Sequence, residues 1–362
     1  MVLKKYDYID FLRGVAILLV IINHIPHTDY ILNESTPLII KKALLAGTYG
    51  VQLFYVVSAF TLCNSIEYRN ENNYKNFYIR RIFRVVPLFY LGIIIYFLYY
   101  YFRSSHLFDF QNFYTLNNFI LNLFFINNFI PPSISFIPGG ETITTELNFY
   151  LIFPFLFYYL IKKKKLFISI IFVIPVMLIL NLIFYKFFNF YDFGQIGFYR
   201  TIYVQLFVFF LGFLLYYLVK KKNFNEAILE NKKNFIIIML TFIFVILNNK
   251  INPEYFYFKN LIIVGYILLF FSYLIFLKKD ILKNYYLYKL ICNFGKVSYS
   301  MYIFHWIVMD AITYIINSHT IFKNSFLNLL IIILSVILIT YLIALISYRF
   351  EKFFINIGRK FR

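Results

Sequence analysis

The sequence predicts an all-α, polytopic integral membrane protein with about ten transmembrane helices and both termini in the cytoplasm. Of its 362 residues, 62% are hydrophobic and only 14% are charged, which is too apolar for a soluble domain of this length. Apolar segments of about 20 residues, long enough to cross a bilayer, alternate with short polar clusters. Lys and Arg gather in every second loop, as expected of loops that face the cytoplasm.

The predicted spans follow one another along the whole chain, and we expect a single membrane-embedded domain over residues 1–362. Membrane helices are predicted near 9–28, 47–66, 85–103, 142–161, 166–185, 198–219, 234–249, 258–277, 297–316 and 325–348. The stretch 119–130 is too short and too rich in Asn to span, which favours a re-entrant or interfacial segment. Basic clusters lie in every second loop, at 66–84, 162–165, 220–233 and 278–289. This alternation supports an even number of helices, because an odd number would break it.

The net charge of +19 would suggest a nucleic-acid-binding protein if the chain were soluble. Here the basic loops explain the charge, so we expect membrane lipids as partners and no nucleic acid. The two cysteines, Cys63 and Cys292, are far apart, and no zinc or nucleotide-binding motif occurs. We therefore expect no metal and no permanently bound cofactor, in a multi-pass protein of the bacterial inner or plasma membrane.

The first apolar segment, from Tyr8 to His24, contains Asp10, Arg13 and His24. Ionisable side chains in a membrane helix are costly, so each is a candidate functional residue. Arg13 and His24 are eleven positions apart, which places them on one helical stripe and about 16 Å apart along the axis. With the N-terminus in the cytoplasm, Arg13 is predicted near the inner face and His24 toward the outer half.

A second cluster, Arg80, Arg81 and Arg84, lies at the start of the third predicted span. The spacings of three and four place these guanidinium groups on one helical face at the cytoplasmic surface. Arg binds phosphate with two parallel hydrogen bonds, so the cluster suits a polyanionic ligand. The alternative is that the arginines only anchor the helix on its cytoplasmic side.

Glu146 is predicted about one turn inside the outer boundary of the fourth span, at a depth similar to that of His24. A carboxylate that orients an imidazole would form a general base. The alternative is an outer-surface carboxylate that marks the start of the helix.

The ninth span carries Ser298, Tyr302 and His305 at positions i, i+4 and i+7, so these residues share one face. We expect them, together with Arg200 at the outer end of the sixth span, to bind substrate. The alternatives are a packing role for His305 and a side chain of Arg200 that extends to the interface.

The ordered series of these segments resembles the acyltransferase 3 family of integral-membrane acyltransferases. The matching segments, in family order, are YIDFLRGVAILLVIINH, GVQLFYVVSAF, FYIRRIFRVVP, TITTELNFYLIFP, QLFVFFLG, FGKVSYSMYIFHW and SYRFEKFF. They cover nearly the whole chain. Three positions depart from the family pattern, since Gln52, Ala59 and Glu141 stand where Asp, Gly and an aromatic residue are usual.

The resemblance implies transfer of an acyl group, commonly acetyl, from cytoplasmic acyl-CoA to a hydroxyl of an exported glycan or lipid-linked saccharide. Arg13 and His24 match the family's Arg-x10-His motif, and Arg81 and Arg84 match its R-x-x-R motif. Glu146 matches its acidic residue in the fourth span. The resemblance thus implies His24, Glu146 and Arg13 as catalytic residues and Arg81 and Arg84, with Arg80, as the acyl-CoA site.

Two other classes of protein share some of these features. Intramembrane Arg and His also mark ion pathways in transporters and flippases, although such proteins usually contain repeated halves, which this chain lacks. A polysaccharide polymerase would share the many helices and a long outer loop, but it has no need of a cytoplasmic Arg cluster.

Overall fold

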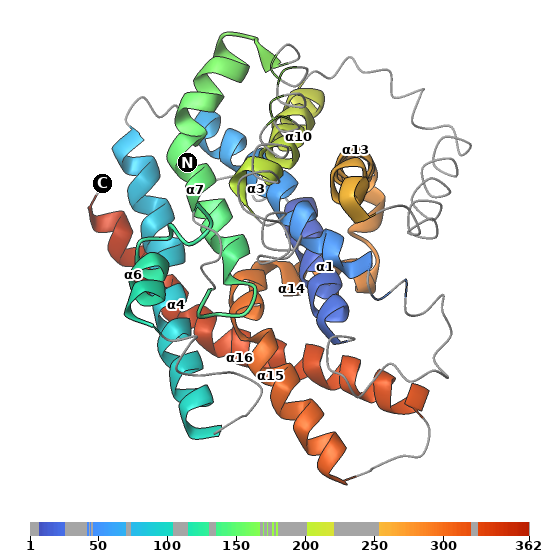
Figure 1. The fold of residues 1–362 in the computed structure, drawn as a ribbon. Coiled ribbons are helices and arrows are strands. Elements are labelled where there is room, and N and C mark those ends of the chain that lie inside the picture. Colours follow the sequence, from blue (N-terminus) through green and yellow to red (C-terminus); the bar gives the residue numbers. More distant parts are fainter. Residues whose placement is uncertain are drawn as a thin grey trace. The chain divides into compact units, whose positions relative to one another are not determined.

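The structure is a computed structural model of the chain, and it describes eight continuous ranges together with six single residues. The ranges are 7–25, 46–69, 74–103, 115–129, 135–166, 201–220, 253–319 and 325–361, and the single residues are 42, 44, 169, 172, 176 and 179. These residues form helices and turns, with no strand among them, which confirms the all-α class for this part of the chain (Figure 1).

Five of the described helices are long and apolar enough to cross a membrane. They cover Ala46–Arg69, Tyr74–Phe102, Ile202–Lys220, Ser298–Ile316 and Leu329–Lys360. Each overlaps a span predicted from the sequence. The predicted spans at 234–249 and, for the most part, 166–185 lie outside the described residues, so the count of ten spans and the cytoplasmic termini stay predictions.

The chain divides into two compact units, each built from two separate stretches of sequence. The first unit contains Met1–Leu62 and Leu211–Ile346, and the second contains Cys63–Phe210 and Ser347–Arg362. Each unit is described by itself below, and the single domain predicted from the sequence stays a prediction.

The first unit is assembled around helix α1 (Asp7–His24). Helices α13 (Pro253–Leu282), α14 (Tyr286–Lys296) and α15 (Ser298–His319) pack against α1, as does the short 3₁₀ helix η2 (Ala46–Tyr49) (Figure 1). The unit also contains the first part of α3 (Gly50–Arg69), the second part of α10 (Ile202–Lys220) and most of α16 (Ser325–Lys360). The apolar residues of α1 that are fully buried, such as Leu12 and Ile17, form the centre of this core.

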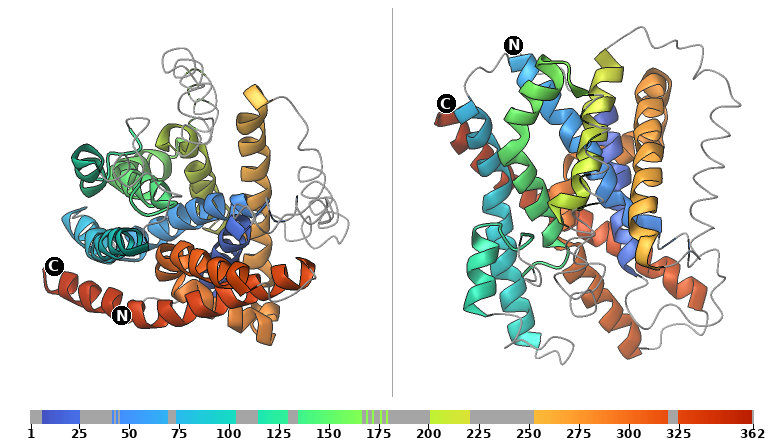
Figure 2. Two further views of the ribbon diagram at one scale, coloured as in Figure 1. Left: turned by 60° about the horizontal axis from the view of Figure 1, so that its bottom comes forward. Right: turned by 45° about the horizontal axis from the view of Figure 1, so that its top comes forward.

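The second unit pairs helix α4 (Tyr74–Arg103) with helix α7 (Gly140–Phe157), which lie side by side (Figure 2). Phe77 of α4 stacks on Phe153 of α7 at 5.6 Å between ring centroids. The Tyr78 hydroxyl donates a hydrogen bond of 2.8 Å to the carbonyl oxygen of Leu151. Helix α7 continues into a short π-helical turn, η3 (Tyr158–Lys162), before the basic cluster at 162–165.

The stretch 119–130 contains only the end of a two-turn helix, α6 (Leu116–Leu123), which begins at an N-cap formed by Thr115. Eight residues reach about 12 Å, far less than the thickness of a bilayer, so the prediction that this stretch does not span is confirmed. The carbonyl oxygen of Leu123 accepts a 2.7 Å hydrogen bond from the hydroxyl of Tyr90, which ties the end of α6 to α4.

Several helix boundaries differ from the prediction. Helix α4 begins at Tyr74 rather than near residue 85, and α16 continues to Lys360 rather than ending near 348. Both extensions are rich in Arg, Lys and aromatic residues, which are compatible with a helix but lower the apolarity on which the predicted boundaries depended. Helix α14 lies wholly between two predicted spans and was not predicted, because its 11 residues are too few and too polar for a membrane helix.

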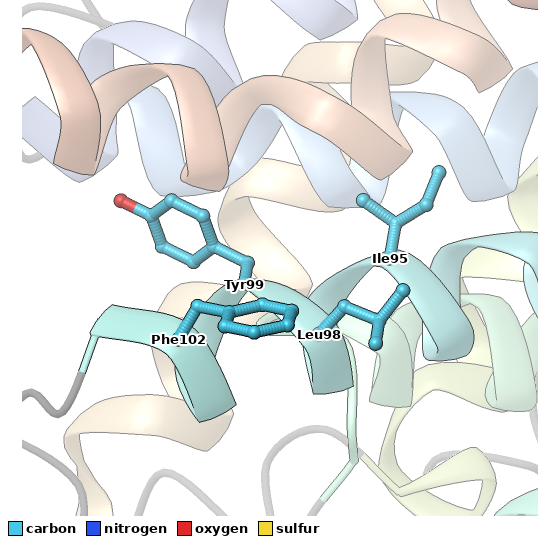
Figure 3. A pocket seen from close by; sticks show the side chains of 4 residues that line it. All are labelled: Ile95, Leu98, Tyr99 and Phe102. Atoms are coloured by element: carbon cyan, nitrogen blue, oxygen red, sulfur yellow. The ribbon is translucent and has the colours of Figure 1, made fainter.

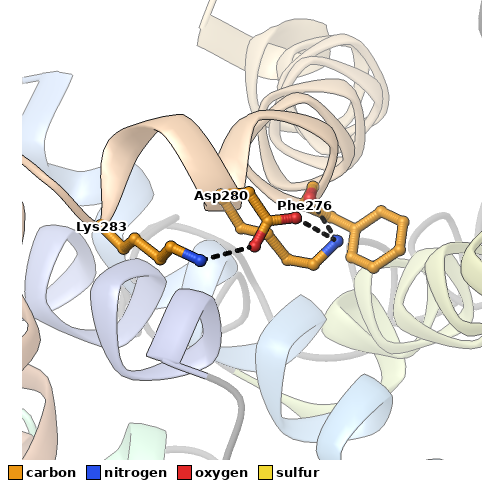
Figure 4. A network of polar contacts seen from close by, with 4 residues as sticks. Phe276, Asp280 and Lys283 are labelled. Atoms are coloured by element: carbon orange, nitrogen blue, oxygen red, sulfur yellow. Dashed lines mark hydrogen bonds and ion pairs between the residues drawn. The ribbon is translucent and has the colours of Figure 1, made fainter.

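The basic cluster predicted as a loop at 278–289 contains the exposed C-terminal end of α13 and the start of α14, and its cytoplasmic side stays a prediction. Lys283 Nζ lies 3.2 Å from Asp280 Oδ1, and Lys279 Nζ lies 3.9 Å from the other carboxylate oxygen and 4.2 Å from the centroid of the Phe276 ring (Figure 4). Such exposed ion pairs contribute less than about 1 kcal/mol to stability. The cluster therefore marks a solvated helix end rather than a site.

Candidate active site

The residues predicted as functional on α1 lie on one unbroken helix, as expected. Asp10 is buried, while Arg13 and His24 are half-buried. Since the helix runs without interruption from Asp7 to His24, the predicted axial distance of about 16 Å between Arg13 and His24 follows from its rise. The two ends of α1 have very different neighbours.

The N-terminal half of α1 packs directly on α14, and two glycines make this contact possible. A Cβ atom on Gly295 would clash with the carbonyl oxygen of Asp10, and one on Gly14 would clash with the carbonyl oxygen of Ile291. Small residues at such a crossing let two helix backbones approach closely. The position of Asp10 and Arg13 is therefore fixed by backbone contacts that the sequence-based prediction missed.

Side chains reinforce the contact between α1 and α14. Phe11 stacks on Tyr288 at 4.7 Å between ring centroids, and the Cys292 thiol lies 3.4 Å from the carbonyl oxygen of Asp7. Burial, together with the nearby carboxylates of Asp10 and Asp7, raises the pKa of Cys292 to about 11. This thiol is therefore protonated at neutral pH and is a packing group rather than a nucleophile.

The C-terminal end of α1 places His24 among aromatic and imidazole rings of α15. The His24 ring lies 5.3 Å from the His305 ring and 4.6 Å from the Trp306 ring, measured between centroids. The structure thus brings together two histidines that the sequence predicted as functional but did not predict as neighbours.

The predicted common face of Ser298, Tyr302 and His305 is confirmed, because all three side chains are buried on α15. His305 is fully buried, and its Nδ1 lies 2.7 Å from the carbonyl oxygen of Tyr302. Tyr302 in turn packs edge-on against Phe54 of α3 at 6.1 Å. Their role in substrate binding stays a prediction, and Arg200, the fourth residue of that prediction, lies outside the described residues.

The predicted Arg cluster lies within α4 rather than at its first turn. Because α4 begins at Tyr74, Arg81 comes seven residues, or about 10 Å, after the first residue of the helix. Arg81 is buried with its guanidinium carbon 5.7 Å from the centroid of the Phe77 ring and 5.5 Å from that of Tyr150. Arg80 and Arg84 are half-buried on the same helix.

Arg84 pairs with Glu351, a buried carboxylate of α16 that the sequence-based prediction did not single out. The Nε atom of Arg84 lies 3.8 Å from Glu351 Oε1, and only 4% of the Glu351 side chain is exposed. Glu351 falls in the segment SYRFEKFF, which was read only as part of the family pattern. The position of Glu351 at the end of a long apolar segment could have identified it, because a carboxylate in such a place needs a cationic partner.

Glu146 belongs to the same cluster as the arginines of α4. It accepts a short hydrogen bond from the hydroxyl of Tyr150, whose ring lies over Arg81, and its charge acts on Arg84. The sequence placed Glu146 in the outer half and the arginines at the cytoplasmic surface, whereas the second unit brings them together. The pairing of Glu146 with His24 stays a prediction, because these residues belong to different units.

A buried polar network holds the N-terminal end of α7, and therefore Glu146, in place. Thr144 donates a 2.8 Å hydrogen bond to Asn127, and the Asn128 side chain donates to Thr145 and to the carbonyl oxygen of Glu141. A further bond joins the amide of Phe136 to the side chain of Asn122, at 3.1 Å. The Asn residues that argued against a membrane span thus serve as the partners of the Thr-rich start of α7.

Two of the departures from the family pattern have a simple packing environment. Ala59 is fully buried where α3 meets α10, and a Cβ atom on Gly212 would lie only 2.6 Å from the Ala59 Cβ. The extra methyl group of Ala59 is therefore accommodated because the facing position is glycine. Gln52, on the same helix, is also buried.

A hollow on the surface of α4 is not part of this polar chemistry. It has a volume of about 480 Å³ and is lined by Ile95, Leu98, Tyr99 and Phe102 (Figure 3). The lining is apolar, and Leu98 and Phe102 are exposed, as expected of a face that contacts lipid chains. The polar groups that could carry a reaction lie elsewhere, on α1 and α15 and on the N-terminal half of α4.

Comparison with known proteins gives one match. No curated protein and no solved structure matches the chain. A family model described as an acyltransferase domain matches residues 6–348, a range that holds every candidate residue on α1, α4, α7 and α15. Because this match covers nearly the whole chain, the protein belongs to the acyltransferase 3 family, and it is a membrane acyltransferase.

Proposed function

We propose that this protein transfers an acetyl group from cytoplasmic acetyl-CoA to a hydroxyl of an exported glycan or lipid-linked saccharide in a bacterial cell envelope. The observation that carries the proposal is the contact between the His24 and His305 rings inside a helical membrane acyltransferase. A thioester and a hydroxyl exchange an acyl group only if a proton leaves the hydroxyl, and a positioned imidazole accelerates this step by roughly 10²–10⁴-fold.

The reaction needs no redox partner. The C–S bond of the thioester breaks, a C–O bond forms to the acceptor, and the hydroxyl proton ends on the thiol of CoA. In this proposal His24 either takes the hydroxyl proton or accepts the acyl group before the hydroxyl attacks. Burial of the rings around His24 supports the proposal, because exclusion of water protects a thioester from hydrolysis.

The arginines of α4 are the proposed site for the phosphates of acetyl-CoA. Arg81 is held rigidly by the Phe77 and Tyr150 rings, so its guanidinium is already oriented for bidentate bonds. Arg84 is partly exposed, and its Nε lies a long 3.8 Å from Glu351 Oε1. A phosphate could therefore replace Glu351 as the partner of Arg84. Arg80, half-buried on the same helix, would add a third positive charge.

The test is a comparison of wild type with His24→Ala, expressed at equal levels in a bacterial host. Mass spectrometry of purified surface glycans should show an added acetyl mass in the wild-type strain and its loss in the variant. His319→Ala is the matched control, since it removes an imidazole from the last residue of α15. Equal ester content in the wild-type, His24→Ala and empty-vector strains would reject acyl transfer and favour a transporter.

A further inference from the structure

The two ring nitrogens of His305 have different surroundings. Nδ1 lies 2.7 Å from the carbonyl oxygen of Tyr302, and a carbonyl only accepts, so Nδ1 carries the hydrogen. The neutral ring then has a bare lone pair on Nε2. This Nε2 atom is buried and has no hydrogen-bond partner among the residues that the structure describes. Buried polar atoms are nearly always paired, so this acceptor is available to a group that enters the site.

A second unpaired group of opposite character lies beside the first. The indole Nε1 of Trp306 is buried and has no hydrogen-bond partner within the described ranges, and an indole N–H only donates. The His305 and Trp306 rings both contact the His24 ring, at 5.3 Å and 4.6 Å. A ligand group that satisfies both must donate one hydrogen bond and accept another. A hydroxyl does so, whereas a thioester only accepts.

We propose that His305 is the catalytic base for the acceptor hydroxyl and that Trp306 holds the hydroxyl oxygen. This proposal rests on the acyl transfer proposed above and decides between its two alternatives for His24. Nε2 of His305 takes the proton as the oxygen attacks the thioester carbon, the C–S bond breaks, and the proton passes to the sulfur of CoA. His24, adjacent to both rings, is then left to act on the thioester.

The decisive variant is His305→Gln, because Gln keeps a hydrogen-bonding group near the position of Nε2 but cannot take a proton. The assay uses the full chain in lipid nanodiscs, with acetyl-CoA as donor and envelope glycans from the host as acceptor, and follows release of the CoA thiol. We expect kcat to fall roughly 10²–10⁴-fold with an unchanged KM for acetyl-CoA. The control is His319→Gln, the same substitution about 21 Å further along α15, which should stay within twofold of wild type.

Three results separate this proposal from the proposed function. An active wild type with an equally active His305→Gln would overturn the role of His305 alone. An inactive wild type would overturn the acyl transfer itself, and this proposal with it. Nitrogen NMR of ring-labelled histidine gives a readout other than activity, since a hydrogen on Nε2 of His305 would exclude it as the base.

A second variant covers the case in which His305→Gln does not fold. Trp306→Phe keeps an aromatic ring against His24 and removes only the N–H donor. We expect about a tenfold loss of kcat, the usual effect of removing one hydrogen bond to a reacting oxygen. Unchanged kinetics in this variant would contradict the proposed hydroxyl site.

Discussion

The two units of this protein treat their ionisable groups in opposite ways. In the first unit, His24 and His305 contact each other's rings, and His24 also contacts the ring of Trp306. Helices α1 and α14 are held together by close backbone contacts at Gly14 and Gly295. In the second unit, Arg81 lies between aromatic rings and Arg84 faces the buried carboxylate of Glu351. The first arrangement surrounds the imidazoles with aromatic rings, and the second holds fixed positive charge that suits an anion.

The largest expected effect concerns the backbone contact of the first unit. Gly295→Ala would place a methyl group against the carbonyl oxygen of Asp10, which belongs to a packed helix and cannot move aside. We expect a loss of stability of about 3 kcal/mol, measured by thermal unfolding in detergent. The comparison variant is Gly358→Ala in the second unit, where the added methyl would come 2.8 Å from the Phe83 Cβ rather than onto a backbone oxygen, so a smaller loss is expected. Equal unfolding temperatures for Gly295→Ala and wild type would contradict the close crossing.

The next effect tests whether water reaches the contact between α1 and α14. The pKa of Cys292 is raised from 9.0 to about 11, first by burial and then by Asp10 and Asp7. At pH 8, alkylation of Cys292 in a Cys63→Ser background should be about 100-fold slower than that of an unperturbed thiol. The rate should rise about tenfold for each pH unit up to about 11. Because the thiolate is disfavoured in the folded state, stability should also fall as pH rises from 9 to 11.

Asp10→Asn provides the control for this measurement. Removing the Asp10 charge should lower the pKa of Cys292 and speed alkylation at pH 8, while the helix contact is retained. A wild-type rate equal to that of a free thiol would show that water reaches the contact between α1 and α14.

A somewhat smaller effect tests the anion site of the second unit. Arg81→Ala removes a preoriented guanidinium, and charge-assisted hydrogen bonds of this kind contribute about 1.5–3 kcal/mol. We expect acetyl-CoA affinity to fall by about 10- to 100-fold in a calorimetric titration. The control is Arg359→Ala. Arg359 is exposed near the end of α16, where it donates a hydrogen bond to Asn356 one turn earlier. If both variants bind as tightly as wild type, the phosphate assignment fails.

The smallest effect concerns the ion pair itself. Glu351→Gln removes the carboxylate that would compete with a phosphate for Arg84. The interaction that is lost is long, at 3.8 Å between Arg84 Nε and Glu351 Oε1. We expect acetyl-CoA to bind up to about fivefold more tightly, because Arg84 no longer has to leave a carboxylate before it binds a phosphate. Weaker binding would indicate instead that Glu351 orients Arg84 for the donor. The titration used for Arg81→Ala distinguishes the two outcomes.

Local periodicity predicted the parts of the site that lie on a single helix. The stripe that joins Arg13 and His24 and the buried face of Ser298, Tyr302 and His305 both follow from 3.6 residues per turn, and both are present. Contacts between helices could not be predicted in this way. The neighbours of His24 on α15 depend on how α15 packs against α1, and such packing leaves no periodic mark on either segment alone.

The missed elements share a physical cause. The prediction searched for runs of about 20 apolar residues, whereas α14 has 11 residues and a strongly one-sided distribution of apolar groups. Its buried Tyr288, Cys292 and Gly295 follow an i, i+4, i+7 pattern that could have predicted it. The start of α4 was missed for a related reason, since arginines that enter the helix interior resemble an ordinary basic loop.

The hydrogen bond between His305 and Tyr302 has a consequence for how the family can diversify. Its acceptor is a main-chain carbonyl of α15, so no replacement of the Tyr302 side chain removes it. The tautomer of His305 is therefore insulated from changes in the surrounding side chains. The side chains around the two histidines can therefore vary while the direction of the imidazole lone pair stays the same.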